Sequence, residues 1–425
     1  MKSKKLLIIS IFLILFGLLF TSSVQAADNL NIYSPSAMLV DAATGKVLYE
    51  KNINETRYPA STTKIMTAIL ALEHCSLDEV ATVSYDAIFT VPSGYANANL
   101  QLGEELTIEQ LLKVLLIPSA NDAANVIAEH IAGSVSSFAN MMNSKAVELG
   151  CTNTHFVNPS GIHHEEHVST ARDLAIMAIY AMKNDTFRNL VKQTYYNLPA
   201  TNKYETTDRV FKTTNDLLRV NNYDRPDNYY YKNAIGIKTG YTSQAKNCIV
   251  AGAERDGLEF IAVILGAEQT ENGLSERYLD CKTLFEYGFE TYSKRKLYDK
   301  NSIYKEITIS NGTKETKNLN LIVENDLSVL IKQDDYNTEL LPTVELNEPL
   351  KAPIMQGDVV GTLSYTVEDI TYKTNLLAGS NVEKSSVLGI LIKIVMIILI
   401  LWIVAQILRL TNKKKKRRRK GNYRL

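Results

Sequence analysis

The chain contains 425 residues, of which 45% are hydrophobic and 22% charged, as expected for a folded protein with one large and one smaller domain. Its 46 basic and 46 acidic residues cancel, but three lysines precede a first apolar run and ten basic residues follow a second run, which contains Lys393. The body between the runs therefore carries 32 basic and 46 acidic residues, and this negative charge argues against nucleic-acid binding through a basic face.

The first apolar run covers residues 6–20 and follows a basic start. The small-x-small sequence Val24-Gln25-Ala26 comes shortly after it, so we predict a secretory signal peptide at residues 1–26. An uncleaved membrane anchor is the alternative, although fifteen apolar residues are few for a membrane span. In either case the body is exported.

The body opens with a predicted β-hairpin, in which residues 37–40 and 47–49 flank a Thr44-Gly45 turn. Apolar spacing then predicts a series of helices, at residues 65–72, 107–117, 122–132, 138–149 and 171–182. Strands return at residues 247–253 and 260–265, around an Asp256-Gly257 turn. Strands at both ends with helices between them imply a single sheet built from distant parts of the chain.

The first motif with chemical potential is Ser61-Thr62-Thr63-Lys64. Ser61 comes just before an apolar helix expected to begin around Thr62, where helix N–H groups favour developing negative charge. Lys64 follows one turn later on the same face, and can act as a base if burial or a neighbouring cation such as Lys238 lowers its pKa. A helix-capping serine beside a solvated lysine is the alternative.

The second motif, Ser119-Ala120-Asn121, follows the helix-ending Pro118. In a loop at this position, Ser119 can relay a proton to a leaving amine, and Asn121 can hold Lys64 and a substrate amide. The alternative is an N-cap for the helix starting near Asp122, and both interpretations can hold together.

A histidine-rich segment follows, with His163, His164 and His167 beside Glu165 and Glu166. The spacing does not match H-E-x-x-H, so we expect a surface loop and no metal. The four cysteines contain no CxxC pair, and we expect mostly buried thiols. A Cys75–Cys151 disulfide is the alternative in an exported protein.

The third motif, Lys238-Thr239-Gly240, lies in an edge-strand-like stretch at residues 235–242, whose glycines allow close backbone approach. Lys238 and Thr239 can bind a substrate carboxylate, and the N–H groups of Tyr241 and Ser61 can form an oxyanion hole. A turn with a surface lysine is the alternative.

Beyond Tyr292 the apolar residues alternate with period two around Asn-Gly and Asn-Asp turns, which predicts a small β domain ending near Thr374. A polar tether is expected at residues 376–386. The 22 residues from Val387 to Leu408 are long enough to span a bilayer. The basic residues 413–420 then place the tail in the cytoplasm and the body outside, in a single-pass arrangement.

The segments around the three motifs, together with Asn158-Pro159-Ser160-Gly161 and residues 167–173, closely resemble the low-molecular-mass penicillin-binding proteins, the serine D-Ala-D-Ala carboxypeptidases. The resemblance runs from about Ala37 to Phe289. It continues more weakly through residues 351–353 and 357–361, which look like the family's C-terminal β-sandwich.

The resemblance implies an α/β penicillin-recognising fold, in which an antiparallel sheet is covered by helices with a helical insertion, followed by a β-sandwich and one transmembrane helix. The expected parts, in chain order, are a signal peptide at 1–26, a catalytic domain at 27–293, a β-sandwich at 294–375, a tether at 376–386, a membrane helix at 387–409 and a basic tail at 410–425.

The resemblance also implies roles for individual residues. Ser61 is the acylated nucleophile and Lys64 its base, and Ser119 with Asn121 completes the proton network. The expected substrate-binding residues are Asn121, Lys238, Thr239, Gly240, Tyr241 and Arg277. Two features depart from the family: Lys246 stands where a glycine is usual, and the C-terminal helix is long enough to span the membrane.

The expected activity is removal of the terminal D-alanine from peptidoglycan pentapeptide stems, without a cofactor and with β-lactams as covalent inhibitors. A β-lactamase is one alternative, but the deacylating E-x-x-L-N sequence does not occur in the chain. A catalytically idle cell-wall-binding or sensor protein is the other. The intact Ser61, Lys64 and Lys238 argue against it.

Overall fold

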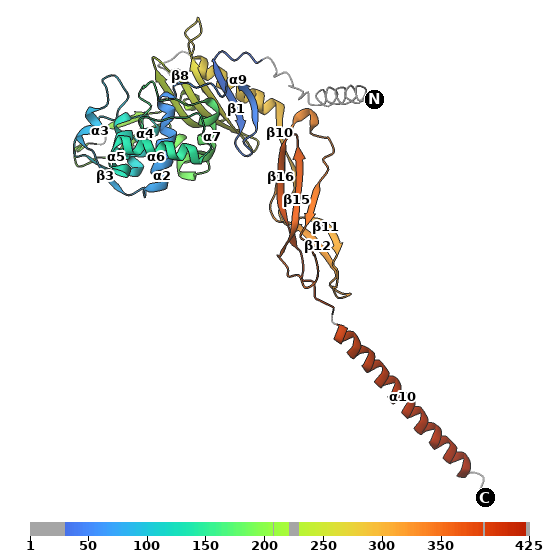
Figure 1. Cartoon of the computed structure of the whole chain (residues 1–425). Coiled ribbons are helices and arrows are strands. Elements are labelled where there is room, and N and C mark those ends of the chain that lie inside the picture. The colour runs from blue at the N-terminus through green and yellow to red at the C-terminus, as the bar shows by residue number, and fades with distance from the viewer. Residues whose placement is uncertain (1–29, 207, 221–228, 386, 422–425) are drawn as a thin grey trace, which may run out of the picture. The chain divides into compact units, whose positions relative to one another are not determined.

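A computed structural model describes residues 30–206, 208–220, 229–385 and 387–421, so the expected signal peptide lies outside the described residues. The chain divides into two compact units, Met1–Tyr292 and Ser293–Leu425. Figure 1 shows helices and a sheet in the first unit, and strands followed by a long helix in the second.

The first unit is built on a five-stranded antiparallel sheet, with the strand order β2-β1-β9-β8-β7. Its strands are β1 (Ser36–Asp41), β2 (Val47–Lys51), β7 (Ala234–Thr242), β8 (Lys246–Arg255) and β9 (Leu258–Ala267). Strand β1 pairs with β9 along its whole length, from Ser36 opposite Leu265 to Asp41 opposite Phe260. The prediction of one sheet from distant parts of the chain is therefore confirmed, and β7 lies at its edge as expected.

Helices cover both faces of this sheet (Figure 1). The helices and 3-10 turns of the unit are η1 (Ala60–Thr63), α2 (Lys64–His74), α3 (Tyr85–Phe89), α4 (Ile108–Leu116), α5 (Asn121–Ala132), α6 (Val135–Glu148), α7 (Ala171–Met182), α8 (Asp185–Val191), η2 (Asp216–Leu218) and α9 (Glu276–Thr291). Alternate strand residues point to opposite faces. Met38 and Val40 join the core shared with α2, α4, α5 and α7, whereas Leu39 and Phe260 closely approach Gly288 of α9.

Local signals account for several helix ends. Thr107 and Gln110 form the capping box at the start of α4, and α7 has the predicted bounds. The first apolar helix begins at Lys64 instead of around Thr62, because residues 60–63 form the 3-10 turn η1. The described part of this unit also contains two small antiparallel sheets of two strands each, β3 (Val80–Thr82) with β4 (Glu105–Thr107) and β5 (Tyr195–Leu198) with β6 (Arg209–Lys212).

The second unit contains two sheets around one apolar core, in the order β11-β12-β16-β15-β14 and β10-β13. The strands and the 3-10 turn described in this unit are β10 (Tyr292–Tyr298), β11 (Ile303–Thr308), β12 (Asn318–Val323), β13 (Leu327–Lys332), η3 (Gln333–Asp335), β14 (Thr343–Leu346), β15 (Val359–Val367) and β16 (Ile370–Ala378). The predicted start of the tether, at residue 376, is too early in the chain. Leu376 and Ala378 are buried residues of β16, and Val382 is buried beyond that strand. The period-two alternation simply continues past Thr374.

The last helix, α10 (Val387–Gly421), is longer than the membrane helix expected at 387–409. Lysine and arginine are good helix formers, so the helix continues into the basic segment. A 24-residue stretch within it, Leu391–Lys414, is long and apolar enough to cross a membrane.

Candidate active site

Ser61 lies in η1, directly before α2, in a tightly packed backbone environment. A Cβ on Gly161 would lie 1.9 Å from the carbonyl oxygen of Ala60, and one on Gly240 would lie 2.9 Å from the nitrogen of Ser61. Real Cβ atoms do not approach that closely, so both positions need glycine. The K-T-G strand and the loop containing Gly161 thus converge on the backbone of the serine.

Lys64 is fully buried at the start of α2. Its Nζ lies 3.0 Å from Ser61 Oγ, and it donates to Asn121 Oδ1 at 2.6 Å and to the carbonyl oxygen of Ser160 at 2.7 Å. Burial, followed by the charge of Lys238, holds the pKa of Lys64 well below its ordinary value. A neutral amine has two N–H groups and one lone pair. If Lys64 is neutral and gives both N–H groups to Asn121 and Ser160, its lone pair faces Ser61 Oγ; if Lys64 is protonated, its third N–H donates to that oxygen.

The second motif brings Asn121 and Ser119 to the same place. The amide nitrogen of Asn121 donates to the carbonyl of Ala96 at 2.8 Å, which orients its oxygen toward Lys64. Ser119 is buried, with a φ of 72°, in the left-handed region. Among the described residues, its hydroxyl has no hydrogen-bond partner. A buried hydroxyl held in this way is available to a bound molecule.

The third motif forms the opposite wall. Lys238 is a buried residue of β7, and its Nζ donates to the carbonyl of Thr239 at 2.8 Å. Burial, followed by the charge of Arg277, lowers the pKa of Lys238 to about 7. Arg277 donates to the carbonyl of Gly240 at 3.2 Å and to the hydroxyl of Tyr278 at 3.0 Å. Two cationic groups are therefore gathered at the K-T-G strand.

These residues meet in a cavity of about 660 Å³. Of the residues expected from sequence, those that line it are Ser61, Ser119, Asn121, Thr239, Gly240, Tyr241 and Arg277. Lys64 and Lys238 lie behind this lining, in contact with Ser61 and Thr239 respectively. Tyr241 is 63% exposed, so its ring is open to a ligand entering the cavity.

Sequence reasoning missed part of the lining. Residues 93–96, Thr213, Thr214 and the ion pair Asp216–Arg219 also face the cavity, and no local pattern marks them. The carbonyl of Ser160 was missed as well, although the Asn-Pro-Ser-Gly segment was singled out. A backbone carbonyl leaves no trace in residue identity, so only its position reveals it.

The prediction that the histidine-rich segment forms a surface loop is only partly correct. Glu165 and Glu166 are exposed, but His167 is buried, and its Nε2 lies 2.8 Å from the hydroxyl of Thr63. The N–H of Val157 donates to its Nδ1 at 3.0 Å. Burial, the largest cause, lowers the pKa of His167 to about 3, so its neutral ring links the Asn-Pro-Ser-Gly loop to η1. All four cysteines are free, so the Cys75–Cys151 alternative is wrong.

Lys246 has a φ of 58° at the turn between β7 and β8. A left-handed backbone conformation favours glycine, and glycine is the residue that the family resemblance leads us to expect at this position. The departure therefore introduces local strain at the turn that follows the K-T-G strand, without preventing the β7–β8 pairing.

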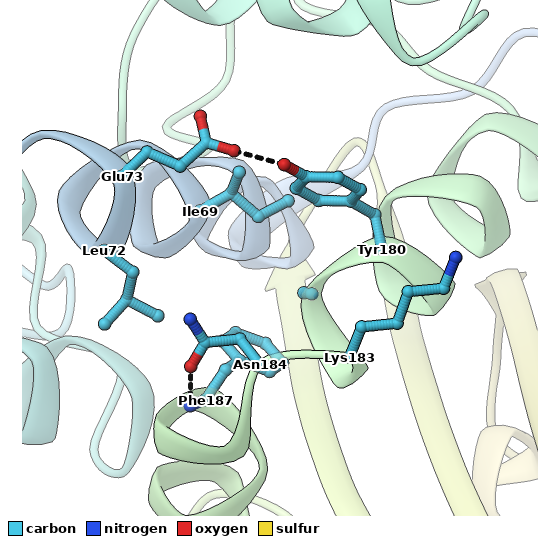
Figure 2. Close-up of a pocket in the computed structure, with 8 residues that line it drawn as sticks. Ile69, Leu72, Glu73, Tyr180, Lys183, Asn184 and Phe187 are labelled. Carbon is cyan, nitrogen blue, oxygen red and sulfur yellow. Dashed lines mark hydrogen bonds between the residues drawn. The ribbon is translucent and has the colours of Figure 1, made fainter.

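A second cavity, of about 260 Å³, lies between α2, α7 and α8 (Figure 2). Three of its polar side chains take part in hydrogen bonds: Tyr180 donates to Glu73 at 2.5 Å, and Asn184 accepts from the N–H of Phe187 at 3.1 Å. Its walls otherwise come from Ile69, Leu72 and Phe187. None of its lining residues is a serine or cysteine, whereas the larger cavity contains Ser61.

A serine hydroxyl beside a buried lysine, faced by a K-T-G strand, is the arrangement of the penicillin-recognising serine enzymes. The sequence matches the Peptidase S11 family, D-alanyl-D-alanine carboxypeptidase, over residues 22–269, and the C-terminal domain of penicillin-binding protein 5 over residues 292–384. The chain belongs to the serine-type D-alanyl-D-alanine carboxypeptidase family.

The relatives agree with this assignment. The D-alanyl-D-alanine carboxypeptidase DacF of Bacillus subtilis (strain 168) is 34% identical over 334 residues, which cover 77% of this chain and 80% of the relative. DacC of Escherichia coli (strain K12) is 29% identical, over 89% of this chain and 92% of that protein. The fold is also that of the solved PBP3 of Streptococcus pneumoniae, with a TM-score of 0.71 and 24% identity over 83% of this chain and 100% of that one.

Proposed function

We propose that Ser61 is the nucleophile of a D-alanyl-D-alanine carboxypeptidase that acts on peptidoglycan pentapeptide stems. The observation that carries this proposal is the hydrogen bonding of Lys64, whose N–H groups point to Asn121 and Ser160 while Nζ lies 3.0 Å from Ser61 Oγ. An amine held in this way can accept the serine proton as the oxygen attacks a carbonyl.

The reaction proceeds in two halves. Ser61 Oγ attacks the carbonyl of the peptide bond between the two D-alanines while Lys64 takes the hydroxyl proton, and the backbone N–H groups of Ser61 and Tyr241 stabilise the oxyanion. The hydroxyl of Ser119, which has no hydrogen-bond partner among the described residues, gives its proton to the leaving amine and takes the proton held by Lys64, and D-alanine departs as the C–N bond breaks. Water then hydrolyses the ester and returns Ser61 to its starting state.

Recognition of the terminal carboxylate is assigned to the K-T-G side of the cavity. Thr239 and Arg277 line it, and Lys238 adds positive charge from beneath. A charge-assisted contact of this kind favours an acid over an amide. A pentapeptide with an amidated C-terminus should therefore be a poor substrate, and equal turnover of the acid and the amide would contradict the assignment.

β-Lactams are expected to acylate the same serine. Ring opening leaves an ester on Ser61, and the chain lacks the E-x-x-L-N glutamate that would promote its rapid hydrolysis. Intact mass after brief exposure to benzylpenicillin should show one adduct, mapped to Ser61 and absent from Ser61→Ala. An adduct on another serine, or rapid turnover without an adduct, would overturn the assignment.

A membrane-bound, single-pass arrangement completes the proposal, with the catalytic unit outside and the basic tail in the cytoplasm. The apolar stretch Leu391–Lys414 and the basic residues at its end support it. Truncation before Val387 should release the remaining chain from membranes after signal cleavage. Retention of that truncated chain would show another attachment surface.

A further inference from the structure

Three side chains able to bind a metal lie together away from the active-site cavity. One ligand atom each from Cys75, Glu79 and His130 lies within 4.8 Å of the other two. The imidazole Nε2 of His130 is 2.8 Å from a carboxylate oxygen of Glu79. Within the described ranges, the sulfur of Cys75 makes no hydrogen bond.

The three side chains come from separate elements that the fold brings together. Cys75 is the C-cap of α2, His130 lies in the last turn of α5, and Glu79 belongs to the turn that leads into β3. The carbonyl of Glu79 accepts from the N–H of Ile108, which attaches this turn to the start of α4. This backbone hydrogen bond holds the turn against α4, and the Glu79 carboxylate lies beside the imidazole of His130.

Thiolate, imidazole and carboxylate together are ligands typical of zinc. Calcium and magnesium prefer oxygen ligands alone, so a thiol and an imidazole select against them. A cation binds the thiolate form of cysteine, so binding at Cys75 would release the thiol proton to solvent. Three protein ligands leave one tetrahedral position for water.

We infer that Cys75, Glu79 and His130 form a zinc site that joins the C-terminal ends of α2 and α5. The N-terminal ends of the same helices carry Lys64 and Asn121, whose side chains are in contact at 2.6 Å. Zinc at this position would tie together the two helices at the ends remote from the catalytic lysine. The inference does not depend on the proposed function.

The test uses the full chain in detergent micelles, stripped of metal with a chelator. The parent should then bind one equivalent of Zn²⁺, and Co²⁺ should give the near-ultraviolet charge-transfer band of a cobalt–thiolate bond. A hundredfold excess of free zinc over its Kd should raise the Tm by on the order of 5 °C. Cys75→Ser should remove the cobalt band and weaken zinc binding by roughly a hundredfold or more.

His74→Ala is the matched control, because His74 neighbours Cys75 in sequence but is not one of the three ligands. It should bind zinc and cobalt like the parent, whereas His130→Ala should lose affinity while keeping the Tm of the metal-free parent. A parent that binds no zinc, a cobalt band that survives Cys75→Ser, or a band that His74→Ala abolishes would each overturn the inference.

Discussion

Replacing Gly240 by alanine tests how closely the K-T-G strand approaches the nucleophile. The added Cβ would lie 2.9 Å from the nitrogen of Ser61, 3.0 Å from Cβ of Ala60 and 3.1 Å from the carbonyl oxygen of Pro59. Comfortable contacts between such atoms begin at about 3.5 Å, so the serine backbone has to move away by roughly 0.5 Å or more. Two of the three contacts are to backbone, which cannot rotate away.

The displaced backbone N–H of Ser61 is the proposed oxyanion-hole donor. Loss of one such donor costs about 10² to 10³ in rate, and a misplacement of about 1 Å can cost about 10². We therefore expect Gly240→Ala to slow acylation by penicillin about a hundredfold, which corresponds to about 2.7 kcal/mol. The measurement is the second-order rate constant for labelling with a fluorescent penicillin, alongside a thermal melt.

Gly252→Ala is the matched control on the neighbouring strand. Its Cβ would lie 3.0 Å from Cγ1 of Ile235, a side-chain atom that can shift by rotation. Both variants place a methyl group in the same sheet and should have similar melting temperatures. If Gly240→Ala acylates at the parental rate, or if Gly252→Ala loses as much, the close approach to Ser61 does not matter for catalysis.

Three further predictions concern titratable groups. Lys64→Met should slow acylation by about 10² to 10⁴, because it removes the base and fills its place with a side chain of similar length; labelling at the parental rate would exclude Lys64 as the base. Because the pKa of Lys238 is about 7, its ammonium is lost as the pH rises through that value, so kcat/KM for a substrate with a free carboxylate should fall on the alkaline side. Lys238→Arg should extend activity to higher pH, and an unchanged alkaline limb would assign it to another group. The pKa of His167 is about 3 in the folded chain and about 6.5 when unfolded, so between these values the unfolded chain binds more protons. The free energy of unfolding should consequently fall as the pH drops, by up to about 1.4 kcal/mol per pH unit, and urea titrations of His167→Gln should show a shallower dependence.

Much of the local structure could be predicted from the sequence. The spacing of Thr107 and Gln110 predicts the start of α4, and the apolar pattern at residues 171–182 gives the bounds of α7. The three motifs identify the residues that meet around Ser61, since each consists of neighbours whose separation along a helix or strand is set by backbone geometry. The period-two alternation beyond Tyr292 likewise predicts strands.

The meeting of those motifs was decided only by the tertiary structure. The long antiparallel pairing of β1 with β9 joins distant parts of the chain, and packing then buries Lys64 and Lys238. Burial lowers the pKa of both lysines, an effect that residue identity alone does not contain. The carbonyl of Ser160 and the buried His167 were likewise found only by position. Local periodicity determines which face of a helix or strand a residue occupies. How far a charged side chain is exposed to solvent, and which groups surround it, depend on contacts between segments far apart in sequence.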